Sequence, residues 1–300
     1  MIDLHIHTKH SDGNHIVQEV LIMAEELRNS AGLQVISITD HDDVVAYQEL
    51  KDNEIRQIYK GEIISGIELS FNLDNRLYDL LGYDIDANKM LELLDARANV
   101  DKKLERENKV LTEFINICHS KGIEHRKDLK VEVGNVHEAF NVVWNDISNF
   151  DEHPKNKSFK EYINKDNINV FHKKHFLNPD SEFFVNLAQY SPTLKEAVDM
   201  IHKCGGKAFL AHSFVYGLDD VGEFIEYAVS CGIDGIEKYY SAHTEEQEKF
   251  IQEYADRYNL YISGGTDFHG EITKPGVKIG VGKGNMNIPI NVIEGWIKSE

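Results

Sequence analysis

The chain has 300 residues, of which 41% are hydrophobic, and it carries 32 basic and 51 acidic side chains for a net charge of −19. This length and apolar content can bury a sizeable core, as one large domain or as a domain with an insertion. The acidic balance disfavours binding along a long nucleic-acid duplex or to an anionic membrane, whereas a small phosphorylated ligand is compatible if metal ions supply positive charge.

In the first 86 residues, short apolar runs alternate with segments of helical period, which is typical of βα units. The expected elements are a strand at Ile2–Ile6, a helix at Ile16–Ser30, a strand at Leu33–Thr39, a helix at Asp43–Ile58, and strands at Glu62–Glu68 and Leu77–Tyr83. A charged helical stretch then extends from about Lys89 to Lys121, and a polar, aromatic region follows to about Gln189. We interpret residues 87–189 as an inserted, mainly helical subdomain.

Regular alternation of strand and helix patterns resumes at Ser191-Pro192. Serine followed by proline predicts the start of a helix there. The expected elements are a helix ending at Gly205, a strand at Lys207–Ala211, a helix at Asp219–Cys231, a strand at Ile233–Glu237, a helix reaching Arg257, and a strand at Leu260–Ser263. Thr244 and Gln247 predict a capping box for the helix that reaches Arg257. Residues 1–86 and 190–300 therefore predict a single α/β sheet or barrel.

The cysteines and the first residues of the chain indicate the cellular compartment that we expect. The three cysteines are Cys118, Cys204 and Cys231. They form no Cys-x-x-Cys, which argues against a disulfide framework or a zinc knuckle. Asp3, His5 and His7 interrupt the first apolar residues, so no signal peptide fits, and no apolar run approaches the about 20 residues that span a bilayer. We expect a cytoplasmic protein.

Polar side chains with metal-binding groups lie at or just after the carboxyl ends of the predicted strands or in the loops that follow, where barrels and open α/β sheets build their sites. The candidate ligands are His5, His7, Asp12, His41, Glu68, Asp79, His212, Asp267 and His269. Alternate side chains of an extended strand share a face, so His5 and His7 can enter one pocket, as can Asp267 and His269. Imidazole and carboxylate without thiolate suit zinc, manganese or iron.

Nine candidate ligands exceed what one ion can bind, so we expect two or three divalent ions that share bridging groups, with Glu68 as the best bridge. Ions about 3.5 to 4 Å apart can lower the pKa of a bridging water and stabilise the attacking and leaving oxygens of a displacement. Such a centre needs no side-chain nucleophile. The sequence agrees, since it has neither a Gly-x-Ser-x-Gly elbow nor a glycine-rich phosphate loop ending in Gly-Lys-Ser/Thr.

The order of the motifs resembles the PHP (polymerase and histidinol phosphatase) family of metal-dependent phosphoesterases. The motifs are His5-Ile-His7, Ser11-Asp12-Gly13, Thr39-Asp40-His41, Gly66-Ile67-Glu68, Ala211-His212 and Asp267-Phe268-His269. The resemblance implies a distorted (β/α)7 TIM-like barrel and three ions. It implies a first ion on His5, His7, Glu68 and Asp267, a second on Glu68, Asp79 and His212, and a third on Asp12, His41 and His269.

Further phrases resemble the nucleotide and oligoribonucleotide phosphoesterases of that family, in which an inserted helical domain covers the active site. They are Leu80–Asp86, Gly235–His243 and Gly264–Gly270. The resemblance implies substrate binding by Lys102, Arg106 and His137; solvated charges on a helix are the alternative for Lys102. Glu68 and Asp267 would be catalytic through the ions. His243 would protonate the leaving group or orient the substrate, and a helix-cap role is the alternative.

Two positions depart from the family pattern. Relatives commonly have histidine where this chain has Asp79, and we expect the carboxylate to favour manganese or iron over zinc. Relatives tend to have arginine where this chain has Asn135, so a bidentate phosphate contact is lost.

The sequence therefore predicts a hydrolase that cleaves a small phosphomonoester, a nucleotide phosphate or a short oligonucleotide end with a metal-bridged hydroxide. The alternatives are a histidinol-phosphate phosphatase, a metal hydrolase of C–N bonds and a catalytically silent metal-binding regulatory module. The sequence does not indicate an oligomeric state.

Overall fold

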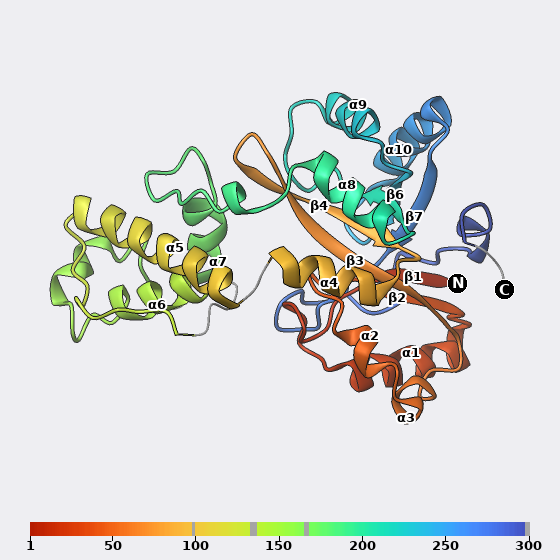
Figure 1. Cartoon of the computed structure of the whole chain (residues 1–300), viewed down its shortest axis with the longest axis horizontal. Helices are drawn as coiled ribbons and strands as arrows, with labels where there is room; N and C mark the ends of the chain where they lie inside the picture. The colour runs from red at the N-terminus through yellow and green to blue at the C-terminus, as the bar shows by residue number, and fades with distance from the viewer. Residues whose placement is uncertain (98–99, 133–136, 165–167, 298–300) are drawn as a thin grey trace. The chain divides into compact units, whose positions relative to one another are not determined.

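The computed structural model describes all residues except 98–99, 133–136, 165–167 and 298–300 (Figure 1). The described chain forms two compact units. The barrel unit contains Met1–Phe71, Tyr78–Leu94 and Pro192–Glu300, and the inserted unit contains Asn72–Leu77 and Asp95–Ser191. Within the inserted unit, the side-chain amide of Asn186 donates to Oδ1 of Asn75 over 2.9 Å and so ties segment 72–77 to the end of the insertion.

Seven strands make up the barrel unit, and they are hydrogen-bonded in sequence order. They are β1 (Ile2–Ile6), β2 (Val35–Ile38), β3 (Glu62–Leu73), β4 (Arg76–Tyr83), β5 (Lys207–Leu210), β6 (Gly235–Tyr240) and β7 (Tyr261–Gly265). The amide of His7 donates to the carbonyl of Phe268 over 2.9 Å, which brings β1 beside the end of β7. The sheet is thus a nearly closed seven-stranded barrel, and the predicted α/β barrel fold is confirmed.

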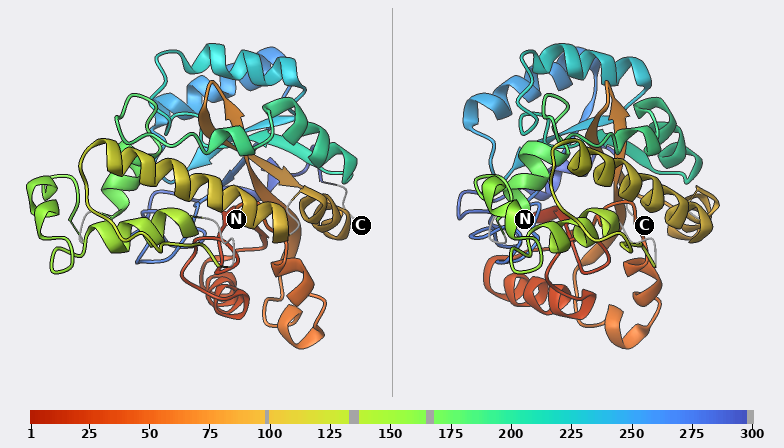
Figure 2. Two further views of the ribbon diagram at one scale, coloured as in Figure 1. Left: turned by 60° about the vertical axis from the view of Figure 1, so that its left-hand side comes forward. Right: turned by 90° about the vertical axis from the view of Figure 1, so that its left-hand side faces the viewer.

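Helices lie around the outside of these strands (Figures 1 and 2). They are α1 (Val17–Ala31), α2 (Ala46–Glu49), α3 (Asn53–Arg56), α4 (Ala87–Arg97), α8 (Leu194–Lys203), α9 (Val221–Cys231) and α10 (Glu245–Tyr258). The capping box of Thr244 and Gln247 is confirmed at α10. The single helix predicted at 43–58 is wrong, because Asp52 caps a new helix start by accepting from the amide of Glu54 over 2.8 Å.

Strand β4 is the distortion of the barrel. A two-residue turn, Asp74-Asn75, joins it to β3, and both residues have positive φ, 51° and 63°, as in the turns that favour tight hairpins. As a result β4 runs antiparallel to β5. Glu68 lies within the long strand β3 and Asp79 within β4, so the prediction that these two residues lie at or just after strand carboxyl ends is wrong. Because β4 is reversed, its amino-terminal half lies at the barrel end where the parallel strands finish, and Asp79 still reaches that end.

The inserted unit is mainly helical and has its own apolar core. Its helices are α5 (Val100–Ser120), α6 (Glu138–Ile147), α7 (Ile168–Phe171) and the short turns η1 (Pro154–Phe159), η3 (His172–Phe176) and η4 (Ala188–Tyr190). Aromatic rings fill the core, among them Phe114, Phe140, Trp144, Phe171 and Phe176. No helix in the part of the chain that the structure describes is long and apolar enough to cross a membrane.

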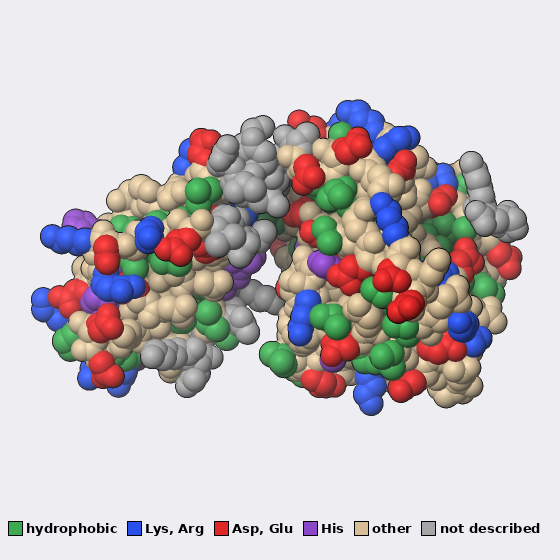
Figure 3. All heavy atoms as spheres, turned by 60° about the horizontal axis from the view of Figure 1, so that its bottom comes forward, with side chains coloured by type: hydrophobic (Ala, Val, Ile, Leu, Met, Phe, Trp, Pro, Cys, Tyr) green, Lys and Arg blue, Asp and Glu red, His purple; other side chains and the backbone are tan. Residues whose placement is uncertain are grey.

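Charge is divided unequally between the two units. The barrel unit has 16 basic and 34 acidic side chains, a balance of −18, and the inserted unit has 16 and 17, a balance of −1. On the face drawn in Figure 3, acidic and basic side chains are interspersed on both units. Almost all of the excess negative charge therefore belongs to the barrel unit.

Candidate metal centre

Glu68 lies at the centre of a buried cluster of imidazoles. Its Oε2 is 3.2 Å from Nε2 of His5, 3.1 Å from Nε2 of His7 and 3.3 Å from Nδ1 of His41. Its other oxygen, Oε1, lies 2.9 Å from Nε2 of His212. One fully buried carboxylate thus touches four rings that come from β1, the loop after β2 and the end of β5.

Asp267 adds a second carboxylate directly after β7. Its Oδ1 lies 3.2 Å from Nε2 of His7, 3.2 Å from Nδ1 of His269 and 3.5 Å from Nε2 of His5. One ligand atom each from His5, His7, Glu68 and Asp267 can be chosen so that all lie within 4.8 Å of one another. The structure therefore brings together the four residues expected to share the first ion.

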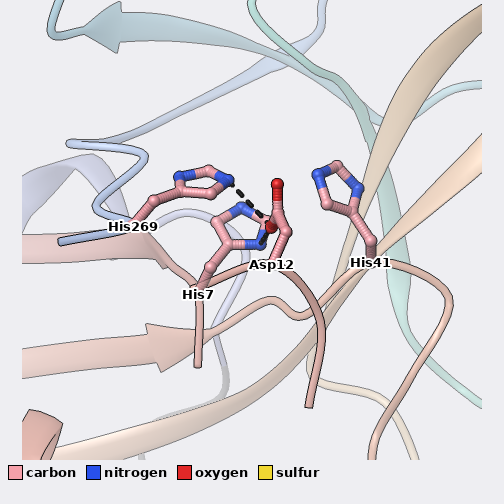
Figure 4. Close-up of side chains that lie close together, drawn as sticks. All are labelled: His7, Asp12, His41 and His269. Carbon is pink, nitrogen blue, oxygen red and sulfur yellow. Dashed lines mark ion pairs between the residues drawn. The ribbon is translucent and has the colours of Figure 1, made fainter. Parts of the chain in front are cut away.

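A second group opens toward solvent through Asp12, whose side chain is 53% exposed. Figure 4 shows Asp12 between three rings, those of His7, His41 and His269. Asp12 Oδ1 lies 3.1 Å from Nε2 of His269 and 3.8 Å from Nδ1 of His7. The three residues expected to bind the third ion lie together, and His7 joins them.

The third group differs from the expected one. Asp79 lies with His41 and Glu68, and these three side chains could hold an ion. His212 contacts the opposite oxygen of Glu68. Asp79 also accepts hydrogen bonds from Ser70 Oγ, over 3.1 Å, and from the hydroxyl of Tyr216, over 3.2 Å. Among the described residues, the candidate group around Asp79 therefore contains His41 in place of His212.

The protonation equilibria of the cluster are strongly shifted. Burial alone would raise the pKa of Glu68, but His41 and His5, with the hydrogen bond from His212, hold that pKa well below its usual range. Burial alone would lower the pKa of His5, but Glu237 and Glu68 raise it well above its ordinary value. Burial and the charge of Glu68 raise the pKa of Asp79. Opposite charges compensate one another in the absence of ions.

The donor set fits divalent metal ions. Nε2 of His7 is buried and lies near two carboxylate oxygens, yet it makes no hydrogen bond to any residue that the structure describes. A buried polar atom without a hydrogen bond is costly, and an ion beside it would remove that cost. Asp267 has a φ of 54°, a left-handed conformation that few non-glycine residues adopt and that often marks functional sites.

Three residues to which the sequence analysis gave no role form hydrogen bonds or ion pairs with the candidate ligands. The fully buried Glu237 accepts from Nδ1 of His5 over 2.8 Å and from the backbone amide of His212 over 2.9 Å. With its Nδ1–H donated to Glu237, His5 directs Nε2 at the cluster, as metal-binding histidines do. Tyr240 and Lys274 both contact Oδ2 of Asp267. Only the position of Glu237 at a predicted strand end could have signalled such a role.

Comparison with known proteins found no matching family model. A 5'-3' exoribonuclease of Haemophilus influenzae is 27% identical over 99% of this chain and 98% of its own length. A 3',5'-nucleoside bisphosphate phosphatase of Chromobacterium violaceum is 25% identical over 89% of this chain and 87% of its own length. A solved structure from Bifidobacterium adolescentis, assigned to the metal-dependent phosphoesterases, superposes with a TM-score of 0.64 at 19% identity and covers 98% of this chain and 94% of that one.

These relatives span both units, and the histidine and carboxylate motifs of this chain meet at one end of the barrel. The chain is thus similar over most of its length to enzymes that act on nucleotide phosphoesters, which agrees with the resemblance of its motifs to the PHP family. In this chain Asp79 is a carboxylate at the position where the motif resemblance implies a histidine.

His243 is a buried neighbour of the candidate centre and packs against the ring of Tyr240. Its Nδ1 donates to the carbonyl of Lys238 over 2.9 Å, and its Nε2 makes no hydrogen bond to a described residue. Burial lowers the pKa of His243. A neutral ring whose Nε2 is an acceptor suits orientation of a substrate hydroxyl better than protonation of a leaving group. His243 is not the N-cap of α10, which is Thr244.

The substrate-binding candidates belong to the inserted unit. Glu107 connects Arg106 with the start of α6. It accepts from the guanidinium of Arg106 over 2.9 Å and from the backbone amide of Ala139 over 2.9 Å. Ala139 lies in the first turn of α6, whose N-cap residue is His137. Arg106 and His137 are thereby held near the start of α6. The side chain of Lys102 and the departure at Asn135 lie outside the described residues.

Proposed function

We propose that this chain hydrolyses a small phosphomonoester, a nucleotide phosphate or the terminal phosphate linkage of a short oligonucleotide, with two or three divalent ions of manganese, iron or zinc. The single observation that carries this proposal is the buried carboxylate of Glu68 in contact with four imidazoles, beside Asp267. Clusters of this kind bind ions that share bridging ligands.

The proposed ligands fall into three sets. His5, His7, Glu68 and Asp267 would hold one ion, Asp12, His41 and His269 with His7 a second, and Glu68, Asp79 and His41 or His212 a third. When bound, such ions act as Lewis acids toward phosphate oxygens and make water a nucleophile near neutral pH. Glu237 binds the Nδ1–H of His5, so that Nε2 is the ring nitrogen that would bind an ion, and Tyr216 and Ser70 orient Asp79.

Substrate recognition is proposed for Arg106 and His137, with Lys102 as a further cation on the same helix. Guanidinium groups bind phosphate in a bidentate way, and the pairing of Arg106 with Glu107 fixes its position before substrate arrives. Replacing Arg106 by leucine should raise KM about tenfold and leave kcat unchanged. Lys109→Leu, at a position on the same helix paired with Glu105, is the matched control. An unchanged KM in the Arg106 variant would contradict this role.

The charge division favours a small substrate. A barrel unit with a balance of −18 repels a long polyanion, whereas ions at the centre can attract one or two phosphates. The relatives named above act, by their names, on RNA from its 5' end and on nucleoside bisphosphates. Both activities hydrolyse a phosphoester bond of a nucleotide, which supports a nucleotide end as the substrate.

The test is phosphate or nucleotide release by the Mn²⁺-loaded protein from a panel of substrates. The panel contains a nucleoside 3',5'-bisphosphate, a nucleoside monophosphate, a short 5'-phosphorylated oligoribonucleotide and histidinol phosphate. We expect turnover of at least one nucleotide substrate and little turnover of histidinol phosphate. Turnover of histidinol phosphate alone would favour the histidinol-phosphate phosphatase alternative. A protein that retains its ions but turns over nothing would contradict the proposal.

A further inference from the structure

The two oxygens of Asp267 have different neighbours. Oδ1 faces His5, His7 and His269, which are proposed ligands. Oδ2 accepts a hydrogen bond from the hydroxyl of Tyr240 over 3.0 Å and forms an ion pair with Nζ of Lys274. The carboxylate therefore connects the metal cluster on one side with a fixed cation on the other.

Lys274 is held in place by its loop. The carbonyl of Gly270 accepts from its backbone amide over 2.9 Å, and Thr273 donates to the carbonyl of Asp12 over 3.0 Å. The ammonium also donates to the hydroxyl of Tyr240 over 2.9 Å and lies 4.7 Å from the centre of that ring. The side chain is only a quarter exposed. These contacts fix the cation against Asp267 without any contribution from an ion.

Lys274 is unusual among the residues that surround the candidate ligands, because it is a permanently charged cation. The candidate ligands include four carboxylates, on Asp12, Glu68, Asp79 and Asp267. Within the described parts of the chain, Lys274 is the one lysine or arginine that forms an ion pair with any of the nine candidates. A divalent ion bound to Oδ1 would supply positive charge to the same carboxylate. Lys274 and that ion therefore act on Asp267 in the same way and repel each other.

We propose that Lys274 is the built-in counter-cation of the metal-free centre: it stabilises Asp267 before ions bind and weakens the affinity of the ion that Asp267 binds. The inference rests on the metal centre of the proposed function. The two partners of Asp267 Oδ2 have different roles under this proposal: Tyr240 only orients the carboxylate, whereas Lys274 also opposes binding of the ion. By linkage, a group that stabilises the metal-free state more than the loaded state lowers metal affinity.

The test compares Lys274→Met and Lys274→Arg with the wild-type protein in two measurements. The first is the Tm of the full chain in EDTA and with saturating Mn²⁺. The second is the Kd for Mn²⁺ by competition with a chelating dye. For Lys274→Met we expect a Tm loss in EDTA at least about 2 °C greater than with Mn²⁺ and a Kd about fivefold lower. Lys274→Arg keeps the cation and should match the wild type in both.

Equal Tm losses in the two conditions, or a Kd that is unchanged or higher in Lys274→Met, would overturn the inference. If Lys274→Met folds only when Mn²⁺ is present, the inference is supported. If it fails to fold in both conditions, the lysine is needed in the loaded state as well and the inference fails. Activity is not part of this test, so an active phosphoesterase with unaltered Mn²⁺ binding in Lys274→Met would refute the inference alone. A wild-type chain that binds no Mn²⁺ would refute both.

Discussion

The barrel unit and the inserted unit differ in their net charge and in the kind of side chain that they bury. The barrel unit concentrates charge, with a balance of −18 and buried carboxylates and imidazoles at one end, whereas the inserted unit has a balance of −1 and an aromatic core. In the barrel unit polar groups are buried against one another, and their cost is offset only by mutual pairing or by ions. In the inserted unit the core is mainly apolar, and buried carboxylates such as Glu107 and Asp146 are paired with neighbouring protein groups.

This difference indicates where function and stability come from. The barrel unit should depend on metal for both activity and stability, and the inserted unit should not. Each of the following predictions tests that separation.

The largest effect is expected from His7→Ala. His7 contacts Glu68 and Asp267 and belongs to two of the candidate groups, so its loss should weaken two ion sites together. We expect turnover to fall by about a thousandfold or more, with fewer ions per chain by elemental analysis. His10→Ala is the matched control, because His10 pairs with Glu49 outside the cluster. Equal activity of the two variants would exclude this site.

Trp144→Ala should disrupt the inserted unit and leave the metal centre intact. Trp144 is 1% exposed and packs against Phe140 and Phe171, so its truncation should cost about 3–5 kcal/mol of unfolding free energy. The measurement is denaturant unfolding followed alongside Mn²⁺ binding. Tyr162→Ala, at a position 46% exposed, should have a small effect. Loss of Mn²⁺ affinity in Trp144→Ala would show that the two units are not independent.

Glu237→Gln should weaken metal binding without removing a ligand. The substitution removes the charge that orients His5 and stabilises its Nδ1–H. We expect Mn²⁺ affinity to fall about 10- to 100-fold, as for other partners of metal-binding histidines. Chelator competition measures this directly. An unaltered affinity would limit Glu237 to a structural role at the end of β6.

The smallest effect concerns pH in the metal-free protein. The pKa values of His5, His41 and His212 are raised by neighbouring carboxylates, so their contribution to stability is complete below about pH 6.5 and is lost as pH rises through the folded values. Glu68 and Asp267 have lowered pKa values, and their contribution is lost only in acid. In EDTA the Tm should therefore fall from pH 6.5 to 9.

Mn²⁺ should reverse this trend, because ions bind neutral imidazoles and the stabilisation by Mn²⁺ grows with pH. The check is a series of thermal melts with EDTA and with Mn²⁺ across that range. A Tm in EDTA that stayed level or rose would contradict the paired state of the cluster.

Much of the architecture could be predicted from local pattern. Strands such as Ile2–Ile6 and the capping box at Thr244 follow from alternation and from residue spacing, both of which are local. The reversal of β4 could not be predicted, because it depends on the turn at Asp74-Asn75 and on pairing with a strand more than a hundred residues away. For the same reason Asp79 was expected with His212 and lies with His41.

The residues of the candidate centre likewise divide into those that local sequence predicts and those that it does not. The histidines and carboxylates that meet around Glu68 were visible as motifs at the ends of the predicted strands. The residues behind them were not, because their role depends on distance alone: Lys274 reaches Asp267 from a loop, and Glu237 joins His5 to the backbone of His212. Their residue types would suit an exposed surface equally well.

The most direct test of the central claim is a metal titration of phosphoester hydrolysis. The protein is stripped with EDTA, ions are restored stepwise as Mn²⁺, and turnover of a nucleoside 3',5'-bisphosphate or a 5'-phosphorylated oligoribonucleotide is measured with the number of bound ions per chain. We predict no turnover in EDTA and recovery as at least two ions bind. A chain that binds two or more ions and hydrolyses none of these substrates, beside an active relative in the same assay, would contradict the account.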